Sequence, residues 1–442
     1  MNKWTRLRQS FWFLPALLCL GAFVLAEGLI FVDRRFADSD LGALDFLIAR
    51  VGESGSRDLL GAIAGSMLTV ASTTFSITIA VLALSSSTYG PRLVRNFMAD
   101  RGNQLVLGIF VATFLYSLMV LRSIRVIGDE PAGYFVPHLA VNVAVLLAVL
   151  SIGVLVYFIH HISDSVQVWT LADQVRVDLI EVVDRLYPED ADGDAIVARA
   201  VPDAPAQLGR GDPITAEVTG YVQGIDYDGL VGLAHEHDLL ISMQVRSGGH
   251  VTTGTTLALV SPPDHLSDEV CQKAGRAVRI GRARNPQQDV EFPALLLEEM
   301  AVRALSPGIN DPYTANNALD NLAGGLVVLA GRPMPSPYRY DREGRQRVVA
   351  PAASLLDIVE HLLDAMRFYA VEHPPVLHRV LELLAQVGAA CPESKAREAM
   401  AAHARHVVDA FAATSPQLSD LASLTEHSVR ACELLLRSPD RA

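Results

Sequence analysis

Small and hydroxylated side chains recur along one apolar stretch of the chain, residues 59–91, which contains no charged residue. They stand three or four residues apart, a spacing that places them on one face of a helix. Small side chains let two membrane helices approach closely, and hydroxyl groups can line a hydrated path without a buried charge. The pattern therefore predicts either a packing face or a conduit, and a homo-oligomer would accommodate both. We call this face the small-residue seam; its central members are Ser66, Thr69, Thr73, Ser76 and Ala80.

Two arginines follow the seam. Gly90 and Pro91 are expected to end the helix, which puts Arg92 and Arg95 at the depth of the lipid headgroups. There they either anchor the chain to anionic lipid or, in an oligomer, form a ring that attracts anions.

A third set of polar residues surrounds a predicted turn in the second half of the chain. Asp311 precedes Pro312, the pattern of a helix N-cap followed by proline at the first helical position. Helix N-termini also bind anions, so a carboxylate or phosphate site is one interpretation. The other is a purely structural turn, which the capping pattern explains by itself. The residues of this candidate ligand loop are Arg303, Ser306, Gly308, Asn310 and Asp311.

Histidine clusters give only weak indications of metal binding. The run His235–Asp238 is interpreted as a polar loop in preference to a metal site. His403, His406 and Asp409 share part of a face on a predicted helix, but no second helix supplies an evident further ligand. We therefore predict no metal site and no cofactor.

Composition and motifs also limit the classes of function. The net charge of -13 argues against nucleic acid as a partner, because phosphate binding needs a basic surface. No phosphate-binding loop, nucleophile elbow or catalytic acid pair is visible, so no catalytic residue is predicted and an enzyme is the least favoured class.

One glycine-punctuated segment is similar to the second half of a lipoyl or biotinyl carrier domain. The similarity lies in residues 244–251, followed by Gly254 and Leu257. A carrier needs a lysine on an exposed hairpin, and none occurs between Lys3 and Lys273. The resemblance therefore implies a small barrel-like β unit without a covalent cofactor.

The elements that must hold these residues fall into two parts. Half of the chain is hydrophobic (50%), its mean hydropathy is +0.29, and the apolar stretches lie before residue 162. A bilayer requires about 20 apolar residues per helix. Residues 1–162 are therefore predicted to be a transmembrane domain with four spans, at about 11–32, 59–86, 104–122 and 136–160.

The remainder is predicted to be a mixed α+β soluble domain. An amphipathic helix and a linker occupy residues 163–212, the barrel-like β unit residues 213–262, and a mostly helical part residues 263–442. A hairpin is expected at 338–349, turning at residues 341–344. Helices are predicted at about 267–281, 293–305, 355–367, 374–387, 393–413 and 418–437, the last four as a C-terminal bundle.

Orientation is not decided by charge. Six Lys and Arg residues flank the spans on each side, so the positive-inside rule gives no preference. The four cysteines, Cys19, Cys271, Cys391 and Cys432, show no disulfide or metal spacing. They favour a reducing compartment for the soluble domain, and hence a cytoplasmic position on a bacterial inner (plasma) membrane.

Two stretches together resemble the bacterial membrane family catalogued as domain of unknown function 2254. The resemblance implies a multi-span N-terminus and a soluble C-terminus over most of the chain, and no established activity. The residues that carry it are 74–77, 86–92, Asn96, Phe97, Asp100, Gln104, 107–108, 114–116 and the run 303–312.

The function expected from the sequence is an oligomeric, non-enzymatic pore or transporter-like protein with a cytoplasmic regulatory domain. Its expected partners are the lipid bilayer, further copies of itself and a small anion or ion. The alternative is a membrane-anchored sensor or scaffold that binds a small anionic ligand or a protein partner. A membrane enzyme is a weaker alternative.

Overall fold

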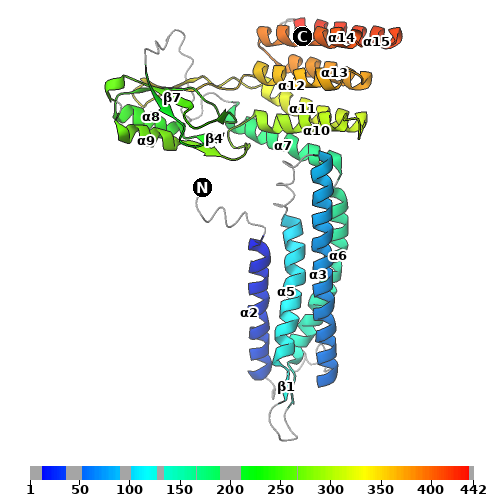
Figure 1. Cartoon of the computed structure of the whole chain (residues 1–442). Coiled ribbons are helices and arrows are strands. Elements are labelled where there is room, and N and C mark those ends of the chain that lie inside the picture. The colour runs from blue at the N-terminus through cyan, green and yellow to red at the C-terminus, as the bar shows by residue number, and fades with distance from the viewer. Residues whose placement is uncertain are drawn as a thin grey trace. The chain divides into compact units, whose positions relative to one another are not determined.

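The computed structural model describes residues 12–35, 52–89, 101–126, 134–165, 167–189, 211–265 and 267–437. The chain divides into two compact units, residues 1–167 and 168–442 (Figure 1). Each unit is described by itself.

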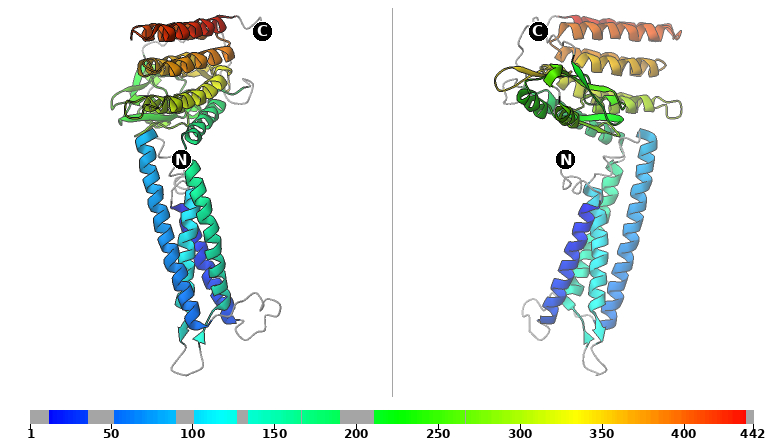
Figure 2. Two further views of the ribbon diagram at one scale, coloured as in Figure 1. Left: turned by 90° about the vertical axis from the view of Figure 1, so that its right-hand side faces the viewer. Right: turned by 60° about the vertical axis from the view of Figure 1, so that its left-hand side comes forward.

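Unit 1 is built from long apolar helices that run alongside one another (Figure 2). They are α2 (Phe13–Arg35), α3 (Glu53–Tyr89), α5 (Arg101–Ser123) and α6 (His138–Ser165). Among the described residues, these four are long and apolar enough to cross a membrane, as the sequence predicts. Two short strands, β1 (Arg125–Val126) and β2 (Tyr134–Phe135), pair antiparallel between α5 and α6.

Helix α5 is the centre of unit 1. Half of its apolar window is buried (50%), against 22% in each of the other three helices, because α2, α3 and α6 all pack on it. Polar contacts tie the helices together near the β1–β2 end. Asp33 accepts hydrogen bonds from the backbone N–H groups of Leu139 (3.1 Å) and Ala140 (3.0 Å), and Tyr116 donates to the Ala140 carbonyl (2.9 Å). A carboxylate at the N-terminus of α6 satisfies two backbone donors that the helix itself cannot.

The β region of unit 2 consists of open sheets, so the barrel-like closure expected from the resemblance to a carrier domain is not found among the described strands. One sheet has the order β3-β7-β5-β10-β9 and the other the order β6-β4-β8. Strand β5 pairs in parallel with β10, a strand about a hundred residues downstream, so the sheet is not a local unit. The strands are β3 (Asp212–Thr215), β4 (Gly220–Ile225), β5 (Leu240–Met243), β6 (His250–Val251), β7 (Thr256–Ser261), β8 (Val278–Gly281), β9 (Tyr338–Tyr340) and β10 (Gln346–Val349).

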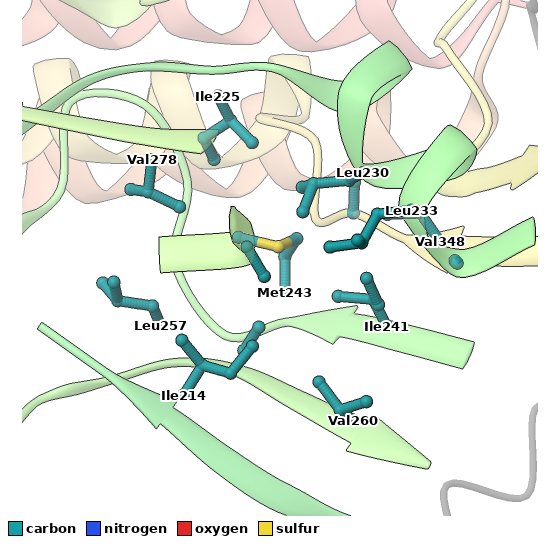
Figure 3. Close-up of a cluster of buried hydrophobic side chains, with 14 of the residues drawn as sticks. Ile214, Ile225, Leu230, Leu233, Ile241, Met243, Leu257, Val260, Val278 and Val348 are labelled. Carbon is teal, nitrogen blue, oxygen red and sulfur yellow. The ribbon is translucent and has the colours of Figure 1, made fainter. Parts of the chain in front are cut away.

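Aliphatic side chains from both sheets meet in one core (Figure 3). Ile241, Val260 and Val348 are fully buried, and Leu230 reaches the same cluster from helix α8 (Tyr227–Glu236). Helix α9 (Asp268–Ala277) closes the cluster with Val270. Burial of apolar area drives this assembly, at about 25 cal/mol per Å².

The rest of unit 2 is helical, and its helices match the predicted ranges closely, apart from α11, for which only the start at Pro312 is predicted. The hairpin predicted at 338–349 forms as β9 and β10, and Gly344 closes its turn by donating to the Asp341 carbonyl (3.0 Å). The helices are α7 (Val168–Leu186), α10 (Glu291–Ala304), α11 (Pro312–Ala330), α12 (Leu355–Tyr369), α13 (Pro374–Ala390), α14 (Ser394–Ala412) and α15 (Leu418–Leu436), with a short 3-10 turn at Pro263–His265.

Two local predictions differ from the structure. The helix expected to reach residue 281 ends at Ala277, because residues 278–281 form β8 and pair with β4. The run beginning at His235 is not a loop throughout, since α8 extends to Glu236 and only His237 and Asp238 follow it.

Candidate functional site

Helix α3 buries one face inside unit 1. Leu60, Ala64, Met67, Ala71 and Thr74 are spaced three or four residues apart, and each is less than 9% exposed. Met67 and Ala71 pack with residues of α5 and α6 in one apolar cluster. This face is the one that α3 uses to join its own bundle.

The small-residue seam lies on a different face of α3. Ser66, Thr69, Thr73, Ser76 and Ala80 are all exposed, so no described helix of the chain covers them. The seam is therefore not the packing face of α3 within one copy. Whatever covers it in the membrane is lipid, water or another molecule.

The seam hydroxyls already have acceptors within their own helix. Thr69 donates to the Gly65 carbonyl (2.9 Å), Thr73 to the Thr69 carbonyl (3.0 Å) and Ser76 to the Ser72 carbonyl (2.9 Å). Such bonds make a hydroxyl tolerable in an apolar environment. Each hydroxyl oxygen keeps lone pairs that can accept a further hydrogen bond.

A second polar row, which sequence reasoning missed, runs through the interior of unit 1. Thr113 and Ser151 approach each other across α5 and α6, with 3.4 Å between their hydroxyl oxygens. Ser117 Oγ and both amide atoms of Asn103 are buried with no hydrogen-bond partner in the described chain. Asn103, Thr113 and Ser117 lie on one face of α5. Their spacing could have indicated this polar row from the sequence, although apolar residues separate them.

Of the remaining sequence candidates, Arg92 and Arg95 lie outside the described residues.

The ligand loop joins α10 to α11, and its polar groups are largely engaged there. Asp311 caps α11 by accepting from the Thr314 N–H (3.1 Å) and hydroxyl (2.6 Å), and these bonds hold the pKa of its carboxyl below the usual value. Arg303 pairs with Glu299 (3.1 Å), and Asn310 adopts a left-handed conformation (φ 48°).

The structure also brings His235 next to acidic residues. Its Nδ1 lies 3.0 Å from Asp341 Oδ2, and Glu343 completes a group of three whose ligand atoms lie within 4.8 Å of one another. Asp341 Oδ2 also accepts from Arg347 Nε (2.7 Å), and its Oδ1 accepts from the N–H groups of Glu343 and Arg345. The Asp341 carboxylate thus lies at the centre of an ion-paired cluster that connects α8 to the β9–β10 hairpin.

Unit 2 contains a pocket of about 140 Å³ that no single sequence motif predicts. It forms where the end of α7, the start of α8, the β5–β6 loop, the residues before α10 and both flanks of the β9–β10 hairpin meet. Two of its walls are fixed by hydrogen bonds. The Tyr187 hydroxyl donates to the Ala353 carbonyl (2.9 Å), and the Gln288 side chain exchanges two hydrogen bonds with the Ile225 backbone.

The acidic groups of this pocket are matched by arginines. Glu291 Oε1 accepts from Arg246 Nη2 (2.6 Å), and Asp289 accepts from both Nε (2.6 Å) and Nη2 (2.7 Å) of Arg284. Burial raises the pKa of the Asp289 carboxyl, although the Arg284 guanidinium opposes the shift. Arg339 also lines the pocket, with its guanidinium carbon 5.1 Å from the centre of the Tyr227 ring.

Comparison with known proteins identifies relatives of undetermined activity. A family model described as "Predicted membrane protein (DUF2254)" matches residues 8–386. Two uncharacterized proteins, from Mycobacterium bovis and Mycobacterium tuberculosis, are each 33% identical over 398 residues, which cover 89% of this chain and 75% of theirs. No solved structure gives a significant match to the chain.

Proposed function

The chain belongs to the DUF2254 family of predicted membrane proteins, and we propose that several copies of it assemble into a non-enzymatic membrane pore or transporter-like protein. In this proposal the small-residue seam of each α3 faces the common axis. The soluble unit lies in the cytoplasm of a bacterium and regulates the path, in keeping with its free cysteines.

One observation carries the proposal: the seam is exposed, yet it does not have the composition of a lipid-facing surface. The exposed face of α6 shows what such a surface looks like, since Leu146, Val149, Leu150 and Ile152 are all more than half exposed. On α3, the exposed positions Ser66, Thr69, Thr73 and Ser76 carry hydroxyls. Lipid gains nothing from these groups, whereas a neighbouring helix or water does.

Contact between copies has a dry and a wet form. In the dry form the seams pack directly on one another, and the internal hydroxyl bonds of Thr69 and Thr73 make this feasible. That form leaves a membrane-anchored sensor or scaffold as the second candidate function. In the wet form the remaining lone pairs of these hydroxyls bind water or ions along the axis, which is the pore.

Cysteine substitution separates these cases. In a variant whose four native cysteines are replaced by serine, single cysteines are placed at Ser66, Thr69, Thr73 and Ser76, with matched lipid-exposed controls at Leu68 and Ile79. Each variant in native membranes is treated with a small water-soluble thiol reagent and, separately, with an oxidant that forms disulfides between copies.

A pore predicts labelling at the mid-span seam positions and none at Leu68 and Ile79. A dry interface predicts disulfide-linked dimers at the seam without labelling, which would favour the sensor or scaffold. If neither labelling nor crosslinking occurs, the seam faces lipid and the pore proposal fails.

A further inference from the structure

We propose that the pocket of unit 2 binds a small oxyanion, a molecule with one carboxylate or phosphate group, and that Arg339 is the cation that recognises it. This inference does not depend on the pore, because every residue it uses belongs to the soluble unit.

The charged side chains of the pocket favour an anionic ligand. Its two carboxylates, Asp289 and Glu291, are both engaged by arginines, with Arg284 contacting both and Arg246 contacting Glu291. Arg246 also lies 3.9 Å from Asp357, which is not part of the pocket lining. Arg339 forms no ion pair with any described residue, so it is the arginine here whose positive charge has no carboxylate partner. A ligand with a single negative charge would neutralise it.

The setting of Arg339 prepares it for such a ligand. Its Nε is buried and has no hydrogen-bond partner in the described part of the chain. An atom without accessible surface is out of reach of a ligand in the pocket, so the ligand would contact the terminal Nη groups of the same guanidinium. The Tyr227 ring beneath the guanidinium holds it in place through a cation–π contact, while β9 pairs with β10 at Val348. A planar guanidinium held in this way suits the paired oxygens of a carboxylate or phosphate.

The size and walls of the pocket limit the rest of the ligand. A cavity of about 150 Å³ holds a benzene ring, so 140 Å³ admits a molecule of comparable size. Pro335, Pro351 and Ala350 give the pocket apolar walls, while the Ser247 hydroxyl donates to Gln288 (3.3 Å) and is therefore engaged. The expected ligand is a compact anion with a short apolar body, for which benzoate is a suitable probe.

The test uses the full chain in detergent micelles. The unfolding temperature is measured against increasing sodium phosphate and, separately, sodium benzoate, with ionic strength held constant by sodium chloride. We expect a saturable rise in at least one series, because a ligand that binds only the folded protein stabilises it. The responding series identifies the chemistry as phosphate or carboxylate.

Three variants assign the effect to the pocket. Arg339→Gln should raise the half-saturating concentration at least about tenfold, since a hydrogen-bonded charge is lost. Ala352→Trp adds bulk at an exposed position on the pocket wall without changing any charge, and should abolish the response. Arg342→Gln removes an exposed arginine from the nearby hairpin turn and should leave it unchanged.

Two results would overturn the proposal: no saturable rise in either series with folded wild-type protein, or an unchanged half-saturating concentration in Arg339→Gln. If Arg339→Gln does not fold, Ala352→Trp decides. A lost response supports the site, and a retained response refutes it.

Discussion

Arg347 Nε lies 2.7 Å from Asp341 Oδ2, and the two side chains are only 6% and 3% exposed. The same guanidinium reaches Asp238 through Nη1 (2.8 Å), so one arginine of β10 joins the hairpin turn to the end of α8. Removing one partner of a buried pair is strongly destabilising, because the other charge stays buried without compensation. The cluster therefore stabilises unit 2 by holding the hairpin turn against the end of α8.

Asp341→Asn should lower the unfolding temperature at neutral pH by about 5 °C or more. The hydrogen bond from Arg347 holds the pKa of the Asp341 carboxyl well below its ordinary value of 3.8. A lowered folded-state pKa gives stability that is complete above the ordinary value and lost as the pH falls towards the folded one. The difference in unfolding temperature between wild type and Asp341→Asn should be constant from pH 6 to 8 and should shrink below about pH 4. Thermal unfolding at each pH measures it. A gap that stays constant under acid conditions would contradict the assignment.

Glu298 should make the protein less stable as the pH rises. Burial raises the pKa of this α10 carboxyl to about 7, and neighbouring Glu299 adds to the shift. The group is unfavourable when charged, so its stability contribution is complete below the ordinary pKa of 4.5 and is lost as the pH rises through about 7. At about 1.36 kcal/mol per pKa unit, the loss amounts to about 3 kcal/mol.

Glu298→Gln should therefore flatten the dependence of unfolding free energy on pH and raise stability at pH 8. Glu398→Gln, at an exposed position of α14, is the matched control and should leave the profile unchanged. Chemical denaturation between pH 5 and 8 measures both. Parallel profiles for wild type and Glu298→Gln would show that Glu298 is not the responsible group.

Two glycine substitutions should have opposite effects. A Cβ at Gly325 of α11 would overlap the side chain of Leu179, which is fully buried on α7. Gly325→Ala should therefore destabilise the protein by about 1–3 kcal/mol through overpacking. Gly232 of α8 has no atom near its missing Cβ, so Gly232→Ala should stabilise the helix by up to about 1 kcal/mol. Denaturant titration of both variants checks the contrast; equal signs would contradict it.

Four spans require the two ends of the chain to lie on the same side of the membrane. A reporter that is active only after export should be silent when fused after Ala442 and active when inserted at Asp45, in the segment that joins α2 to α3. A reporter active only in the cytoplasm should give the reverse pattern. Export of the fusion after Ala442 would refute a cytoplasmic soluble unit.

Local periodicity predicted most helices of this protein well, and its failures have physical causes. Helix α8 was missed because Gly229 and Gly232 interrupt it, although Asp226 caps it through the Gly229 N–H (3.0 Å). The last predicted turn before residue 281 becomes β8 because pairing with β4 outweighs helix propensity.

The candidate sites were harder to predict than the helices, because each depends on which distant parts of the chain pack against its residues. The spacing of Ser66, Thr69 and Thr73 showed that they share a face, but only the folded helices show that this face is uncovered. The pocket brings together Tyr187, Arg246 and Arg339 from segments far apart in the chain, so no local motif marks it.

The parallel pairing of β5 with β10 also has a consequence for biosynthesis. Ile241 lies opposite Val348, so the ribosome must make more than a hundred further residues before β5 gains its second neighbour. Until then β7 covers one edge of β5 and the other remains open. Pairings between such distant residues form slowly, and an unpaired edge invites association with other chains. A nascent chain stalled before residue 345 would therefore be a substrate for chaperones, while its membrane helices would already be complete.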